Sequence, residues 1–200
     1  MQNLQAEYLQ ELMNIAIGNA TASIAEILDA FGTMYIPKVT MYTPSELKKG
    51  FKTNIKEGEF YYTTRQLFSG EFNGEALFIL TDSSASNLVN HLYKSSEVTP
   101  EEKIDAIMEL ANILNATIIG RLAGELQTEV QFSAPSTKYV LDEHIIEDDE
   151  IINYSKIIAI ETVITFKDQD IYSKILILTK DRAINKLLEL IDHKLEDLFS

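Results

Sequence analysis

The sequence predicts an α+β domain with pseudo-two-fold symmetry, in which each half consists of a long helix, three strands and a closing helix, with a largely antiparallel sheet. Three observations predict it: a polar motif that occurs twice with an offset of 98 residues, the same order of helical and strand patterns after each copy, and short turns between neighbouring strand patterns. We therefore expect a single domain, residues 1–200, built of two internal repeats of about 1–98 and 99–200.

The repeated motif is a glutamate, an asparagine three positions later, and a proline after 22 further residues. Its members are Glu11, Asn14 and Pro37 in the first half, and Glu109, Asn112 and Pro135 in the second. Between residues 7–37 and 105–135, 7 of 31 aligned positions are identical, and the segments 79–81 and 177–179 match at the same offset. Duplicated ancestry is the simplest explanation.

Each half opens with a long helical pattern. Residues 3–30 place apolar side chains on one face without an internal proline, and Gly32 is expected to end this helix. The second helix begins at the run Thr99-Pro100-Glu101-Glu102, which is a capping box with proline at the first helical position, and is expected to continue to residue 126.

Strand patterns follow each long helix. They cover 38–42, 59–68 and 74–80 in the first half, and 139–141, 156–166 and 172–178 in the second. The segments 69–73 and 167–170 are short enough to connect antiparallel neighbours. Closing helices are expected over 83–93 and 181–195, and each motif proline is expected to fix the turn from helix into strand.

Composition narrows the function. With 200 residues, of which 46% are hydrophobic, the chain can bury a sizeable core. The absence of cysteine excludes disulfides, thiolate metal sites and cysteine nucleophiles. A formal net charge of −14 argues against a nucleic-acid partner. The acidic stretch 142–150 is expected to be a solvated loop or a short surface helix, with binding of a basic partner as the alternative.

Membrane and export signals are not found in the sequence. No apolar run reaches the roughly 18 residues that a membrane span needs, and the first residues lack the basic start of a signal peptide. We therefore expect a cytoplasmic location without membrane insertion.

Helical phase separates the motif acids and amides from the packing face. Because each residue advances about 100° around a helix, Glu7, Glu11 and Asn14 fall on one stripe opposite the apolar residues. Asp105, Glu109 and Asn112 repeat this stripe in the second half. In either copy alone these would be ordinary solvated side chains, but the repetition, with a proline at the same distance, favours a shared function.

Other chemistries fit less well. A glycosidase needs two carboxylates across a cleft, and a di-metal carboxylate site in a bundle needs histidine on its helices. The three histidines, His91, His144 and His193, lie in separate segments and are expected to be surface or boundary residues. Nucleotide-cradle and nucleophile-elbow motifs are absent from the sequence. We expect no metal site and no self-contained phosphoryl or acyl transfer.

The motif resembles that of the CheC/CheX/FliY phosphatases of chemotaxis, which reads [D/S]-x-x-x-E-x-x-N, 22 residues, then P. The second copy fits fully through Asp105, whereas the first has Glu7 at that position and keeps the negative charge. Two sites on one chain of this length are similar to the CheC type. CheX-type members carry one site and dimerise, and FliY-type members append a switch domain, for which no room is expected after Ser200.

The resemblance implies dephosphorylation of the phospho-aspartate of a CheY-type receiver. Asn14 and Asn112 would insert into the receiver and position the attacking water, while Glu11 and Glu109 would contact its active-site lysine. The receiver supplies Mg²⁺, so no cofactor is expected on this chain. A CheD-type deamidase is a further implied partner, and a monomer is expected. The alternatives are a non-catalytic adaptor that binds a receiver, such a deamidase or the flagellar switch, and a helix face that serves self-assembly.

Overall fold

The computed structural model describes residues 1–51, 55–94, 98–146 and 154–199. Its helices and strands confirm the predicted antiparallel α+β class. In chain order they are α1 Asn3–Ile27, β1 Gly32–Met34, β2 Lys38–Tyr42, α2 Pro44–Phe51, β3 Phe60–Gly70, β4 Gly74–Thr81, α3 Asp82–Tyr93, α4 Pro100–Glu125, β5 Val130–Phe132, β6 Ser136–Leu141, β7 Ile157–Phe166, β8 Ile171–Lys180 and α6 Arg182–Phe199, with 3-10 helices at Asp142–His144 and Lys167–Gln169.

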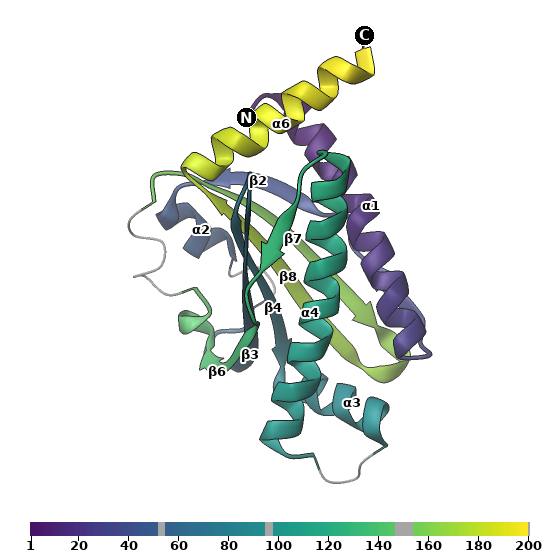
Figure 1. The fold of residues 1–200 in the computed structure, drawn as a ribbon. Coiled ribbons are helices and arrows are strands. Elements are labelled where there is room, and N and C mark those ends of the chain that lie inside the picture. The colour runs from purple at the N-terminus through teal and green to yellow at the C-terminus, as the bar shows by residue number, and fades with distance from the viewer. Residues whose placement is uncertain (52–54, 95–97, 147–153, 200) are drawn as a thin grey trace.

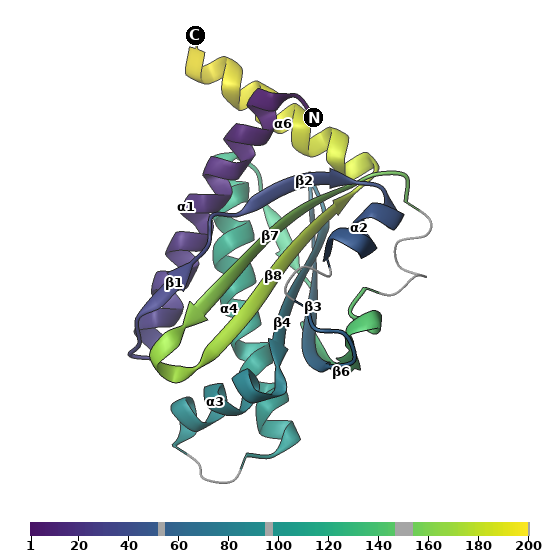
Figure 2. The same ribbon diagram turned by 180° about the vertical axis from the view of Figure 1, so that it is seen from behind.

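The helices surround a single antiparallel sheet. The two long helices α1 and α4 lie side by side on one face and run in opposite directions (Figure 1). The short helix α2 lies on the other face, and α3 and α6 lie at opposite ends of the molecule (Figure 2). Thr99 begins α4 through the predicted capping box, in which its hydroxyl accepts from Glu102 N and its own N–H donates to the Glu102 carboxylate.

The two halves of the chain interleave in the sheet. Its eight strands follow the order β1-β7-β8-β4-β3-β5, and β2 also pairs with β7 while β6 also pairs with β3. The short strands of the first half therefore pair with the hairpin of the second half, and those of the second half pair with the hairpin of the first. Any site beside these short strands contains residues from both halves.

The central strands β4, β7 and β8 are largely buried on both faces, which explains their nearly continuous apolar runs. The helix-side cluster combines residues of α1 and α4 with strand residues such as Phe78, Ile160 and Ile177. The opposite-face cluster combines Leu47 of α2 with Tyr61, Leu77, Ile79, Ile145, Ile146, Ile157, Ala159, Leu176 and Leu178. Helix α4 is long and apolar enough to span a membrane by length and composition, but 56% of that window is buried inside the protein.

The offset of 98 residues holds for the long helices but not for the sheet. Buried positions of α1, such as Leu9, recur in α4 at that offset, as at Ile107. In the hairpins the prediction is wrong, because Ile79 belongs to the opposite-face cluster whereas Ile177 belongs to the helix-side cluster. Ile79 corresponds instead to Leu178, since a slip of one residue turns every strand side chain to the other face.

A second shift affects strands β3 and β7, which flank the central pair β4 and β8 in the sheet. Ser136 pairs with Arg65, and Lys38, which precedes Ser136 by 98 residues, pairs with Glu161. Arg65 therefore corresponds to Glu161, and the next residue, Gln66, corresponds to Thr162. The different connections in the two hairpins, a short turn after β3 and a 3-10 helix after β7, absorb these shifts.

Three elements were not predicted. Strands β1 and β5 have three residues each, which is too short for a periodic pattern to be visible. Helix α2 follows Thr43, whose backbone N–H donates to the Glu46 carboxylate at 2.8 Å, and it buries Leu47 completely in the opposite-face cluster. These elements extend the sheet and cover part of its second face.

The two motif prolines do not occupy the turns from helix into strand that the sequence predicted. Pro37 lies in the gap between β1 and β2, and Pro135 lies in the gap between β5 and β6. Proline has no N–H to donate, so it interrupts an edge strand at these positions. Ser133 N still donates to Leu67 O at 3.0 Å. The backbone before Pro135 is thereby held against β3.

The described part of the acidic stretch 142–150 is anchored rather than freely solvated. Asp142–His144 forms the expected short helix at the surface, and the following Ile145 and Ile146 are buried in the opposite-face cluster. The Asp142 carboxylate also accepts from Gly58 N at 2.9 Å. Residues 147–150 lie outside the described residues.

Candidate functional site

The motif acids lie on outward faces of the two long helices. Glu7 and Glu11 on α1 are exposed, as are Asp105 and Glu109 on α4. Within the described part of the chain, none of these four carboxylates forms an ion pair or a side-chain hydrogen bond. They are therefore free to receive a cation from another molecule.

Asn112 belongs to a polar network beneath the exposed face of α4. Gln66 on β3 donates from Nε2 to Asn112 Oδ1 at 2.9 Å and to Ser133 O at 2.9 Å. Asn115, one turn further along α4, donates from Nδ2 to Gln66 Oε1 at 2.9 Å. Gln66 and Asn115 are each only 2% exposed, whereas Asn112 is exposed. The network thus connects the protein interior to the surface amide.

The first copy of the motif has a different environment. Thr162, the counterpart of Gln66, donates its hydroxyl to Tyr35 O at 2.6 Å. Ile17 stands where the second copy has Asn115, and it is fully buried. Asn14 is partly buried, and no described residue forms a hydrogen bond with its side chain. The fold therefore places both motif amides on helix surfaces but supports only the second through a network.

Sequence reasoning did not find Gln66, Asn115 or Ser133. Asn115 is recognisable in the sequence as unusual, because it is a polar residue on the apolar face of α4 at a position where α1 has Ile17. Gln66 is harder to recognise from the sequence, because it becomes the counterpart of Thr162 only through the strand register, which is visible only in the pairing of the sheet.

The histidines do not contribute to either motif. His91 Nε2 contacts Leu28 O, His144 lies 3.5 Å from Glu143, and His193 lies 3.9 Å from Asp197. Among the described residues, no group of three or more histidines and acids is arranged to hold a metal ion.

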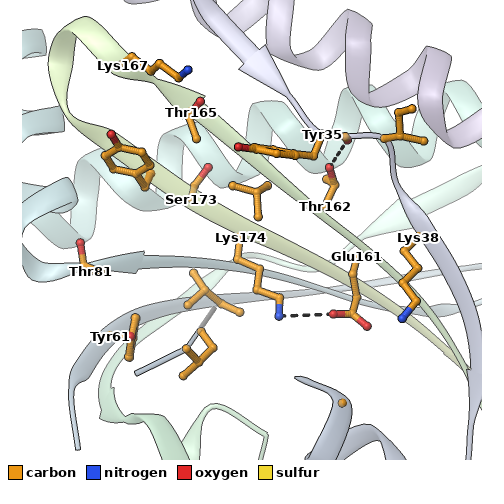
Figure 3. A pocket seen from close by; sticks show the side chains of 16 residues that line it. Tyr35, Lys38, Tyr61, Thr81, Glu161, Thr162, Thr165, Lys167, Ser173 and Lys174 are labelled. Carbon is orange, nitrogen blue, oxygen red and sulfur yellow. Dashed lines mark hydrogen bonds and ion pairs between the residues drawn. The ribbon is translucent and has the colours of Figure 1, made fainter. Parts of the chain in front are cut away.

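A cavity of about 590 Å³ lies over the face of the sheet that is turned away from α1 and α4 (Figure 3). Glu161 of β7 and Lys174 of β8 approach each other in it, with 3.4 Å between their carboxylate and ammonium groups. None of the motif acids or amides lines this cavity. Its lining shares only Tyr35 and Thr162 with the described surroundings of the first motif copy.

The buried lysine of this cavity predicts a pH effect on stability. Burial lowers the pKa of Lys174 below its ordinary 10.5, although Glu161 partly opposes this shift. Between the folded pKa and 10.5 the unfolded chain binds more protons at this group, so the group adds stability as the pH rises through that window. Replacing the pair by Lys174→Met with Glu161→Gln should remove this contribution. Urea unfolding from neutral pH to pH ~10 should show that the wild type gains free energy of unfolding relative to the variant.

The matched control is Lys56→Met, because the Lys56 side chain is 79% exposed. This variant should follow the pH dependence of the wild type. A difference between wild type and the cavity variant that stays constant with pH would contradict the lowered pKa of Lys174.

Comparison with known sequences adds no relative. No protein-family model and no curated protein matches the chain.

Comparison with solved structures identifies the fold. The crystal structure of Thermotoga maritima FliY matches with a TM-score of 0.76 and 16% identity, over 97% of this chain and 98% of that chain. The chemotaxis protein CheX of Desulfovibrio desulfuricans matches with a TM-score of 0.56 and 15% identity, over 84% and 99%. FliM of H. pylori, from a FliG-FliM complex, matches with a TM-score of 0.64 and 10% identity, over 94% and 100%.

The chain is thus a duplicated α+β protein with one interleaved antiparallel sheet and two long helices on one face. More particularly, its fold is the one shared by FliY, CheX and FliM.

Proposed function

We propose that the chain belongs to the CheC/CheX/FliY family and dephosphorylates the phospho-aspartate of a CheY-type response regulator. One observation carries the proposal. Two copies of glutamate followed three residues later by asparagine lie on the surfaces of α1 and α4, with their carboxylates unpaired among the described residues. The fold on which they lie is also that of CheX and FliY.

The proposed chemistry requires little of this chain. In the reaction, water attacks the phosphorus in line with the aspartyl oxygen, the bond from phosphorus to that oxygen breaks, and inorganic phosphate leaves the regenerated carboxylate. Catalysis of this kind rests on positioning and on electrostatic stabilisation. Mg²⁺ belongs to the receiver in this proposal.

Each motif residue has a distinct role in the proposal. Glu11 and Glu109 pair with the active-site lysine of the receiver, which fixes how the receiver docks. Asn14 and Asn112 enter the receiver and hold the attacking water through their carboxamides. Glu7 and Asp105, one helical turn earlier, add negative charge along the same stripe. No covalent intermediate forms on this chain.

The direct test is the decay of a phosphorylated CheY-type receiver. Substoichiometric amounts of the purified protein should accelerate phosphate release by about 10-fold or more, because each molecule positions water repeatedly. Phosphate release is followed with and without the protein, at constant Mg²⁺. An unchanged decay rate with every receiver of the host would contradict the proposal.

The second candidate is an adaptor without hydrolytic activity. It is favoured by the FliM neighbours, since FliM of H. pylori has this fold and was crystallised in complexes with FliG and with SpeE. An adaptor would bind a receiver, a CheD-type deamidase or the flagellar switch. Stable binding of a phosphorylated receiver without faster decay would favour this function over the phosphatase.

A further inference from the structure

The orientation of the Asn112 amide follows from a backbone carbonyl. Ser133 O can only accept a hydrogen bond, so the Gln66 atom 2.9 Å away must be its nitrogen, Nε2. The same nitrogen faces Asn112, which must present its oxygen, Oδ1, and Gln66 Oε1 then accepts from Asn115. One carbonyl therefore decides the orientation of all three amides.

This orientation leaves defined groups of Asn112 for a ligand. Both N–H groups of Nδ2 and the second lone pair of Oδ1 remain, because Gln66 occupies only one lone pair. Both hydrogens of Gln66 Nε2 are used, and Gln66 and Asn115 are closed off from solvent. A flip of the Asn112 amide would place two donors against each other, which burial makes costly.

The first copy cannot hold its asparagine in this way. The hydroxyl of Thr162 has a single proton, and it is donated to Tyr35 O at 2.6 Å. Ile17, at the counterpart of Asn115, offers no polar group. Asn14, which is partly buried, therefore has no hydrogen bond from a described residue to fix the orientation of its amide.

We infer that Gln66 and Asn115 are positioning residues that preorganise Asn112, so that the second of the two sites is poised for a ligand and the first is not. The inference rests on the proposed function only for its effect on the reaction. Under that function the second site carries most of the turnover, because a positioned amide loses less freedom when water and receiver bind.

The test uses a variant that gives the second site the residues of the first. Gln66→Thr with Asn115→Ile copies the arrangement of Thr162 and Ile17, which already packs in this fold. Side-chain amide ¹⁵N relaxation should give Asn112 an order parameter above ~0.6 in the wild type and Asn14 one below it. In the variant, Asn112 should become as mobile as Asn14.

The wild-type comparison decides the inference even if the variant does not fold. Equal mobility of Asn112 and Asn14 in the wild type would overturn it, and so would an Asn112 amide that stays rigid in the variant. The reverse exchange, Thr162→Gln with Ile17→Asn, should rigidify Asn14.

A kinetic measurement distinguishes a failure of this inference from a failure of the proposed function. In an Asn14→Ala background, the exchange at Gln66 and Asn115 should lower kcat about 10-fold and leave KM unchanged, since Glu109 still docks the receiver. An unchanged kcat would overturn the positioning role. If the wild type does not hydrolyse any receiver, the proposed function fails, and the amide mobilities alone decide whether Gln66 and Asn115 hold Asn112.

Discussion

Replacing Asn14 and Asn112 together by alanine is expected to abolish the acceleration of receiver dephosphorylation, so that the phosphate leaves at the receiver's own rate. An alanine side chain cannot hydrogen-bond a water, so neither site could position the attacking water. The measurement is phosphate release from a phosphorylated receiver with wild type and double variant at equal concentration. The glutamates remain, so receiver binding should persist in a pull-down or by calorimetry.

The single variants rank the two sites. Asn112→Ala should remove more of the activity than Asn14→Ala, because only Asn112 is held by the Gln66 network. The control is Asn19→Ala, which removes an exposed amide of α1 outside the motif and should leave the rate unchanged. Full activity in the double variant would contradict the assignment of these residues, whatever the behaviour of the controls.

The second large effect concerns stability. Gly74 begins β4 at a point where two neighbours leave no room for a side chain: an added Cβ would lie 2.2 Å from Leu178 O and 2.5 Å from Phe68 Cζ. Gly74 of β4 pairs with Phe68 of β3, so β4 cannot move away from Phe68 without losing that pairing. Gly74→Ala should therefore lower the free energy of unfolding by about 3 kcal/mol, measured by urea denaturation.

Gly120→Ala is the matched control and should have the opposite sign. Gly120 lies inside α4, where an added Cβ meets nothing within 4 Å. Because glycine in a helix interior costs about 0.5–1 kcal/mol relative to alanine, this variant should be slightly more stable than the wild type. The first half already has alanine, Ala22, at the corresponding position of α1. Unchanged stability of Gly74→Ala would contradict the close approach of β8 to the start of β4.

The elements that the sequence predicted well are long or strongly periodic. Helix α4 began at its capping box, and the hairpins of β3 with β4 and of β7 with β8 appeared where alternating or continuous apolar runs flank short turns. The short strands β1 and β5 and the helix α2 were not predicted, because three to eight residues carry too little periodicity. Their positions depend on pairing with distant strands.

The constant offset of 98 residues identifies equivalent positions in the long helices but not in the hairpins. It holds between α1 and α4, where insertion would rotate the apolar face out of the core. In the hairpins, the identical segments 79–81 and 177–179 do not occupy equivalent places, since Ile79 and Ile177 point to opposite faces of the sheet. Local identity could not show this, because the face of a strand residue is set by its pairing register.

In the candidate site, too, some features follow from the local sequence and others only from the tertiary structure. The sequence alone determined the duplicated order of long helices and hairpins, and it placed Glu11 and Asn14, with Glu109 and Asn112, on outward helical stripes, because helix phase depends only on spacing along one segment. Only the tertiary structure decided how the second asparagine is held. Gln66 comes from the first half and Asn112 from the second, and the interleaved sheet brings them within 2.9 Å. Contacts between distant segments follow from strand pairing and packing, which no local pattern records.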